Sequence, residues 1–139
     1  MLRRPTYSVN PIDVGQKKGI GISVVFNNDT SVFNTTTTTK EQVKSNLINY
    51  ILTDKGERLF NPTFGGNLRA SLFEPDTAFD SVAARLENEI YAYVPNIIIR
   101  DISIKRSSDI NYITISLSYS INNQDDNLVI NVSTQDLTQ

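Results

Sequence analysis

Residues 113–121 alternate between large apolar side chains and small hydroxyl side chains without a break, and this pattern restricts the fold more than any other in the chain. The apolar members are Ile113, Ile115, Leu117, Tyr119 and Ile121. A period of two residues places them on one face of a β-strand. The pattern therefore predicts a strand with one face on a hydrophobic core and the other face in water.

Two more strand patterns flank this segment, at Ile97–Lys105 and Leu128–Val132. The connections between the strands, Ser107–Asn111 and Asn122–Asn127, are short and polar, so we expect neighbouring strands to be antiparallel. If the strands lie in sequence order, the last one forms an edge of the sheet, and it has no Lys, no Pro and no visible bulge to block further pairing. Either the N-terminal arm of the same chain covers this edge, with the alternating Ile20–Phe26 stretch as the candidate, or the edge accepts a strand from another protein.

Three helices are expected before the strands, at about residues 40–53, 67–73 and 77–93. Apolar side chains recur at helical spacing in the first and the last of them. Helices followed by a run of strands predict an α+β fold, with three helices packed on a small antiparallel three-stranded sheet. We expect residues 1–39 to form an extended N-terminal arm with a Thr-rich linker, and residues 40–139 to form the compact domain.

The sequence also suggests where these helices begin and end. Thr38 and Glu41 match the capping box, in which a hydroxyl and a carboxylate satisfy the first free backbone N–H groups of a helix. Gly56 suits a left-handed C-cap after the first helix. Asp76 or Thr77 is the expected N-cap of the last one.

The composition narrows the chemistry that the chain can perform. It contains no Cys and no His, which excludes disulfides, Ser-His-Asp triads and most catalytic zinc sites. No apolar run reaches the roughly 18–20 residues that span a bilayer. The net charge is −2, and the sequence has no cluster of Lys and Arg such as nucleic-acid binding proteins typically carry. We therefore expect no cofactor, no metal, no small-molecule substrate, no nucleic acid and no membrane partner.

The 23-residue stretch from Thr53 to Pro75 is dense in Gly and Pro, with three of the six Gly and two of the five Pro of the chain. We interpret it as a rigid structural corner between helices, locked by Phe60, Phe64 and Phe73. Its expected members are Gly56, Glu57, Arg58, Pro62, Phe64, Gly65 and Gly66. Two other interpretations are weaker. The first is a phosphate loop at Gly65-Gly66, but the Lys-Ser/Thr of such a loop is missing. The second is a glycosidase, in which Glu57 and Glu74 would form the carboxylate pair.

The order of residues in this stretch resembles a known family. Three motifs follow one another: Thr53-x-x-Gly56-Glu57-Arg58, Asn61-Pro62-x-Phe64-Gly65 and Leu72-Phe73-Glu74-Pro75. Their order is similar to that in the small baseplate wedge protein of contractile phage tails and in its relatives in type VI secretion and other injection systems. The resemblance covers about Val24 to Ile121. It implies a structural subunit of the tail baseplate in the virion, assembled in the host cytoplasm. A phage member of the family was once labelled a lysozyme, so a tail-associated glycosidase is the alternative function.

The resemblance also implies two partners. As sheath initiator, the protein would bind the tail sheath protein by strand addition, and the candidate acceptor residues are Leu128, Val129, Ile130, Asn131 and Val132. The second partner would be the wedge core, bound just after the long helix, where the family usually has Glu-Pro-Arg. This chain has Val94, Pro95 and Asn96 there. Because both charges are lost, either the partner has changed to match or docking relies on apolar packing around Pro95.

Overall fold

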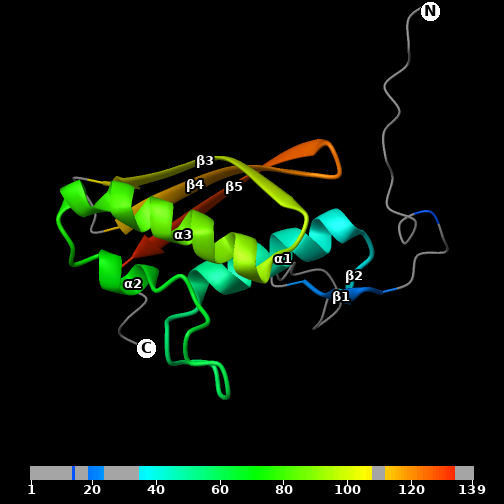
Figure 1. The fold of residues 1–139 in the computed structure, drawn as a ribbon, viewed down its shortest axis with the longest axis horizontal. Helices are drawn as coiled ribbons and strands as arrows, with labels where there is room; N and C mark the ends of the chain where they lie inside the picture. The colour runs from blue at the N-terminus through cyan, green and yellow to red at the C-terminus, as the bar shows by residue number, and fades with distance from the viewer. Residues whose placement is uncertain (1–13, 15–18, 24–34, 108–111, 134–139) are drawn as a thin grey trace, which may run out of the picture.

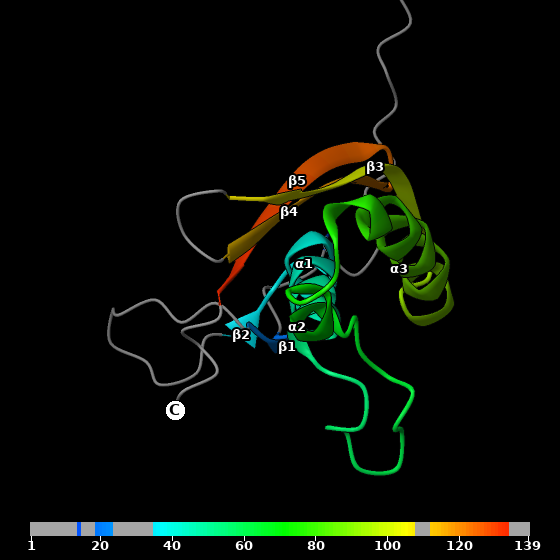
Figure 2. The ribbon, with the colours of Figure 1, turned by 90° about the vertical axis from the view of Figure 1, so that its left-hand side faces the viewer.

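A three-stranded antiparallel sheet with two long helices along one face forms the body of the protein (Figure 1). The computed structural model describes residues 14, 19–23, 35–107 and 112–133. The strands are β3 (Ile97–Arg106), β4 (Tyr112–Ile121) and β5 (Gln124–Ser133), in the order β3-β4-β5. Figure 2 shows helices α1 (Thr39–Leu52) and α3 (Phe79–Tyr93) on the same side of this sheet. The predicted α+β class and the sequential antiparallel strand order are both confirmed.

The hydrophobic core lies between this sheet and the two helices. Every apolar member of the β4 alternation is buried, and Tyr119 is completely inaccessible. The other strands contribute Ile97, Ile99, Leu128 and Val132. The helices contribute Leu47, Tyr50 and Ile51 from α1 and Phe79, Val82, Leu86 and Ile90 from α3. Burying these side chains is the main term that stabilises the fold.

A β-bulge at Arg100 changes which side chains of β3 face the core. Ile99 pairs with Tyr119 and Asp101 pairs with Ser118, so Arg100 has no partner on β4. The extra residue shifts the alternation by one. As a result, odd-numbered isoleucines point toward the helices before the bulge, and even-numbered Ile102 and Ile104 pack against the core after it.

The hairpin between β4 and β5 is tighter than the sequence analysis expected. Ile121 pairs with Gln124, so only Asn122 and Asn123 form the turn. Both have positive φ, 49° and 63°, the pattern of a type I′ turn. Asn tolerates this conformation because its short polar side chain can bond locally. The last strand therefore begins four residues earlier than predicted, at Gln124.

Helix α1 begins with the predicted capping box. The Glu41 N–H donates to Thr38 Oγ1 at 3.2 Å, and the Thr38 N–H donates to Glu41 Oε2 at 3.4 Å. Its predicted C-cap is wrong, because the helix ends at Leu52 with extended Thr53 as the cap. Gly56 does have a positive φ of 94°, but in the turn that follows.

The connection between α1 and α3 contains two short helical segments. Helix α2 (Leu68–Ser71) is shorter than predicted, and the 3₁₀ turn η2 (Asp76–Ala78) precedes α3 directly. Because the chain already coils through η2, Ala78 occupies the N-cap position of α3, without a side-chain bond. The prediction of Asp76 or Thr77 as N-cap is therefore wrong.

A small two-stranded sheet packs beside α1. Strands β1 (Gly21–Ile22) and β2 (Thr35–Thr36) are antiparallel. Thr36 is buried, and its hydroxyl donates to the Gln42 side chain on α1. Of the strand expected at residues 20–26, only Gly21 and Ile22 form a strand in the described part of the chain, and residues 24–26 lie outside that part. The boundary at residue 39 stays a prediction.

Candidate interaction surfaces

Strand β5 is a free edge of the three-stranded sheet, as far as the described residues show. It pairs with β4 in unbroken register from Tyr112–Ser133 to Ile121–Gln124. Leu128 and Val132 face the helices and are buried, whereas the Val129 side chain is 62% exposed on the outer face. The five residues expected to accept a partner strand thus lie along one edge and alternate between core and solvent.

The two-residue turn decides which backbone groups of β5 point outward. In such a hairpin the residues that close the turn bond to each other, so Gln124 and every second residue after it bond to β4. Val129 and Asn131 then direct their N–H and C=O groups away from the sheet. The N–H of Asn127, which also points outward, bonds to the Asp126 carboxylate at 3.0 Å.

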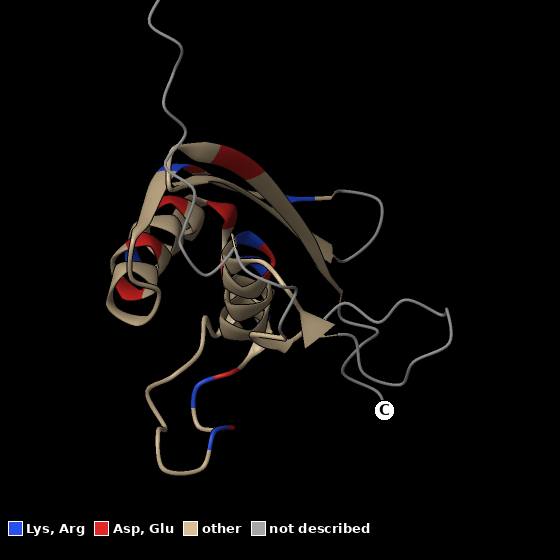
Figure 3. Cartoon of the chain, turned by 90° about the vertical axis from the view of Figure 1, so that its right-hand side faces the viewer, with Lys and Arg blue, Asp and Glu red and all other residues tan. Residues whose placement is uncertain are grey.

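The acidic residues of β5 gather at its hairpin end (Figure 3). Asp126 accepts a hydrogen bond from Tyr119 Oη at 3.2 Å and lies 3.6 Å from Lys40 Nζ. Asp125 lies 3.9 Å from Arg100. These contacts partly neutralise the acidic charge at the hairpin end, and the rest of β5 carries no charge.

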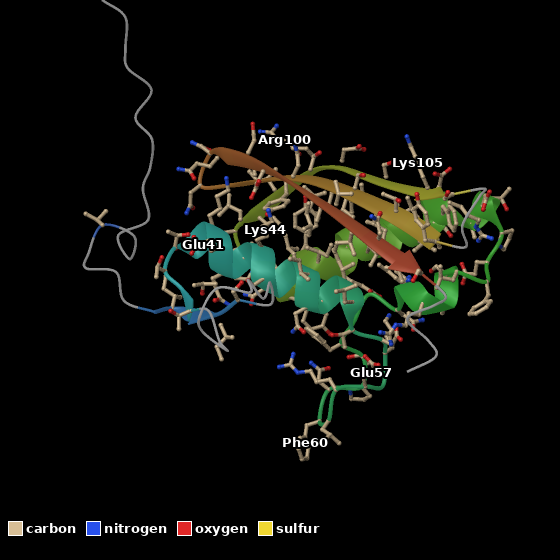
Figure 4. The ribbon with its side chains drawn as sticks, turned by 180° about the vertical axis from the view of Figure 1, so that it is seen from behind. Glu41, Lys44, Glu57, Phe60, Arg100 and Lys105 are labelled. Atoms are coloured by element: carbon tan, nitrogen blue, oxygen red, sulfur yellow. The ribbon has the colours of Figure 1, made fainter. Side chains whose placement is uncertain are left out.

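The predicted corner is only partly as the sequence suggested. Phe64 is buried, and it packs edge-to-face on the Tyr50 ring at 5.1 Å. Phe60 and Phe73, in contrast, are 103% and 76% exposed, so the prediction that they lock the corner is wrong. Phe60 lies at the far end of a projecting loop (Figure 4). Aromatic residues in a short connection have no periodicity from which their burial can be predicted.

Gly65 and Gly66 fix the path of the chain where it returns to the core. The Gly66 N–H donates to the Tyr50 carbonyl at 2.8 Å, which brings the loop against the end of α1. Gly65 has a φ of 124°, and a Cβ there would lie 2.4 Å from the Thr53 carbonyl oxygen. Only glycine fits this close approach without strain.

The charged residues of the corner support the loop. The Asp54 N–H donates to Glu57 Oε2 at 2.9 Å, and Arg69 lies 3.4 Å from Asp54 and 3.6 Å from Glu57. Both carboxylate oxygens of Glu57 are thus engaged within the protein. Glu74 contributes its backbone carbonyl, which accepts a bond from Arg106.

The turn after α3 holds the second predicted docking residues. The Val94 side chain is buried, so it belongs to the core. Pro95 and Asn96 are exposed, and Asn96 has a positive φ of 64° that reverses the chain into β3. Of the three predicted wedge-core residues, two are therefore available at the surface.

A pocket of about 270 Å³ lies between this turn, α1 and side chains of the projecting loop. Its lining residues are Asn46, Asn49, Tyr50, Arg58, Phe64, Tyr93 and Val94. The Arg58 guanidinium lies over the Phe64 ring, 4.4 Å from its centre. Sequence reasoning missed this pocket, because its walls come from segments far apart in the chain.

Behind the pocket, Glu89 on α3 joins three segments. It accepts hydrogen bonds from Tyr50 Oη and Lys55 Nζ, both at 2.7 Å, and lies 3.5 Å from Arg85. Burial alone would raise the pKa of Glu89, but these bonds and the two cations outweigh it and lower the pKa. Burial, with the hydrogen bond to Glu89, raises the pKa of the Tyr50 hydroxyl. This arrangement is typical of a structural anchor, in which both partners keep one protonation state near neutral pH.

Among the described residues, no three Asp or Glu side chains come together as metal ligands would. No helix in the described ranges is both long and apolar enough to cross a membrane.

The model of the baseplate wedge protein gp25 family (GPW_gp25) matches residues 37–126, which is more than half of the chain. The chain belongs to this family. It is therefore a structural component of a tail baseplate, and the baseplate of the virion or virion-like particle is its location. The match begins just before α1 and ends within β5, so it spans the helices and the sheet.

Two solved structures have the same fold. A presumed tail lysozyme of Geobacter sulfurreducens is 18% identical, with a TM-score of 0.63 over 72% of this chain and 95% of that one. A chain of the anti-feeding prophage (AFP) baseplate is 22% identical, with a TM-score of 0.57 over 72% of this chain and 81% of that one. No curated protein sequence matches the chain.

Proposed function

We propose that this baseplate wedge protein initiates assembly of the tail sheath by accepting β-strands from sheath subunits along β5. The observation that carries the proposal is the outward direction of the Val129 and Asn131 backbone groups on an edge without Lys, Pro or a bulge. Natural sheets usually protect such an edge. An unprotected one is suited to strand addition, in which main-chain hydrogen bonds supply the affinity.

The opposite edge of the sheet is protected. Strand β3 carries the bulge at Arg100, and it also carries Lys105 and Arg106 near its end. Bulges and charged side chains are the usual means of preventing edge-to-edge pairing. Strand β5 also carries charges, Asp125 and Asp126, but these lie at its hairpin end, and Leu128–Val132 carries none. The contrast between the two edges therefore favours this part of β5 as the acceptor.

The turn after α3 is the proposed contact with the wedge core. Pro95 and Asn96 are exposed there, and the adjacent pocket is bounded by Tyr93 and Arg58. A partner that packs on Pro95 would meet apolar and amide surface rather than a charge pair. This supports the interpretation in which docking relies on packing.

We further propose that the chain catalyses no reaction. Glu57, one of the two carboxylates considered for glycoside hydrolysis, is occupied by Asp54 and Arg69 in supporting the loop. Turnover of purified peptidoglycan by the wild-type protein, abolished by Glu57→Gln or Glu74→Gln, would establish the glycosidase alternative instead. The expected result is no turnover above a buffer control.

The test of strand addition uses Val129→Pro. This substitution removes an outward N–H without breaking a bond to β4, so the isolated fold should lose little stability. Ile130→Pro is the matched control, because its N–H bonds to β4 and its loss should destabilise the sheet. Baseplates carrying each chain are mixed with purified sheath protein, and sheath formation is counted by electron microscopy.

We expect the Val129→Pro protein to fold, enter the baseplate and fail to nucleate sheath. If sheath forms normally on Val129→Pro baseplates, β5 is not the acceptor. If the folded variant fails to enter the baseplate, β5 has a role in the wedge itself, which also contradicts the proposal.

A further inference from the structure

The loop between α1 and α2 presents two large apolar side chains to solvent. Leu59 is 84% exposed and Phe60 is 103% exposed, and they are adjacent at the end of the loop that points away from the body (Figure 4). The N–H of Asn61 donates to the Arg58 carbonyl at 3.3 Å, so the two residues occupy the centre of a tight turn. We call residues 58–61 the loop tip.

The base of this loop is held in place by a dense set of bonds. The Gly56 N–H donates to the Pro62 carbonyl at 2.9 Å, which joins the two sides of the loop below the tip. Arg69 bridges Asp54 and Glu57 and so fixes the loop to α2. A loop fixed in this way loses little conformational freedom when it binds, which favours affinity.

The tip also carries a conformational strain. Phe60 has a φ of 67°, in the left-handed region that side chains other than Gly, Asn and Asp rarely adopt. Strained residues of this kind occur preferentially at binding sites, where the surrounding structure maintains them. The Phe60 ring is fully exposed, so no buried contact of that ring offsets the strain.

Arg58, the first residue of the loop tip, extends its positive charge back toward the body of the protein. The Arg58 guanidinium stacks on Phe64, and within the described ranges it forms no ion pair with a carboxylate. Its neighbours Lys55 and Arg69 both have acidic partners. The charge of Arg58 is therefore available to an incoming group at the mouth of the pocket.

We propose that Leu59 and Phe60 insert into an apolar pocket of another baseplate protein, and that a carboxylate at the rim of that pocket pairs with Arg58. The proposal rests on membership of the wedge family and is independent of strand addition at β5. Adjacent aromatic and aliphatic side chains on a rigid turn are typical anchors of protein interfaces. The complementary charge would fix the orientation of the partner.

The variant that isolates this role is Phe60→Asn. Asn accepts a positive φ, so the turn should persist while the apolar ring is lost. Leu59→Ser is a second variant, with no backbone strain at issue. Phe73→Ala is the matched control, because Phe73 is 76% exposed but lies outside the tip.

The experiment compares particles assembled with each variant in place of the wild-type chain. The amount of the chain per particle is measured by quantitative mass spectrometry. We expect Phe60→Asn and Leu59→Ser to melt like the wild type and to be incorporated at least about tenfold less, as loss of a buried anchor predicts. The Phe73→Ala control should be incorporated normally. The amount of Arg58→Gln per particle should lie between that of this control and that of the two tip variants.

A photo-crosslinking amino acid at position 60 identifies the partner in assembled particles. The expected crosslink joins the tip to an apolar segment with an Asp or Glu, in a different tail protein. Normal incorporation of the Phe60→Asn protein would overturn the proposal. A markedly lower melting temperature of this variant would also overturn it. Crosslinks only between copies of this chain, or tip-dependent binding of the protein to phosphatidylglycerol vesicles, would overturn it as well.

The proposal for the loop tip and the proposal for β5 can fail independently of each other. Val129→Pro is expected to enter particles and to lose only sheath formation, whereas Phe60→Asn is expected not to enter them. Normal sheath formation on Val129→Pro would therefore leave the role of the tip intact, and normal incorporation of Phe60→Asn would leave the role of β5 intact.

Discussion

The Tyr50 hydroxyl on α1 donates a hydrogen bond of 2.7 Å to the Glu89 carboxylate on α3. The same carboxylate accepts a bond from Lys55, at the beginning of the projecting loop. One acidic group thus fixes both helices and the loop relative to one another. Through Tyr50 it also supports the aromatic cluster of Tyr50, Phe64 and Tyr93, which lines the pocket beside the turn after α3.

Replacement of Tyr50 by Phe should destabilise the protein by about 1–2 kcal/mol. The ring and its packing on Phe64 are kept, and a hydrogen bond to a charged acceptor is lost. Urea unfolding measures the change. The same substitution in a Glu89→Gln background should cost less, and equal costs in the two backgrounds would contradict a direct coupling of the pair.

Stability should decline in acid because of Glu89. The pKa of its carboxyl group is lower in the folded protein than the ordinary value of 4.5, so the unfolded chain takes up the proton first. The contribution of Glu89 is complete above pH 4.5 and is lost as the pH falls through the folded pKa. Glu89→Gln should show a flatter decline in unfolding experiments below pH 4.5. An identical slope in wild type and variant would assign acid sensitivity to other carboxyl groups.

Stability should also decline in alkali because of Tyr119. Burial and the neighbouring Asp126 carboxylate raise the pKa of its hydroxyl above the ordinary value of 10.0. The unfolded chain therefore loses this proton first, so the stabilisation is present below pH 10 and decreases as the pH rises further. Tyr119→Phe should reduce the slope of stability against pH above 10. Tyr50 contributes in the same direction, so the Tyr119→Phe, Tyr50→Phe double variant should be flatter still.

Alanine should be tolerated less well at Gly65 than at Gly56. Both positions have positive φ, 124° and 94°, which costs an Ala residue about 1 kcal/mol or more. At Gly65 the added methyl would also lie 2.4 Å from the Thr53 carbonyl oxygen, whereas nothing lies within 4 Å at Gly56. Thermal melting should therefore rank wild type above Gly56→Ala and Gly56→Ala above Gly65→Ala. A reversed order would mean that the loop relaxes around the new side chain.

Elements with a strong local signal were predictable from the sequence. The alternation in β4 and the capping box of Thr38 and Glu41 both specify their structure through neighbouring residues alone. The β-bulge at Arg100 was missed, although the change of parity between Ile99 and Ile102 is its trace in the sequence. The Asn122-Asn123 turn was also missed, because the polar run to Asn127 looked like a longer loop.

The candidate surfaces were less predictable than the fold. Phe60 and Phe73 were expected to be buried, since most phenylalanines are, but their exposure depends on where the whole loop projects. The bond between Tyr50 and Glu89 joins residues 39 positions apart, and no local pattern encodes it. The edge position of Leu128–Val132, by contrast, followed from short connections and was confirmed by the strand order.

The bulge at Arg100 has a consequence for stoichiometry. A three-stranded sheet has two edges, but a strand added beside β3 would meet a break in the regular spacing of its hydrogen bonds. On the proposal of strand addition, each copy of the protein would therefore accept one in-register strand, along β5. If sheath subunits add at β5, each copy of this chain can seat one subunit through its sheet, and the number of copies in the baseplate sets the number of subunits in the first ring.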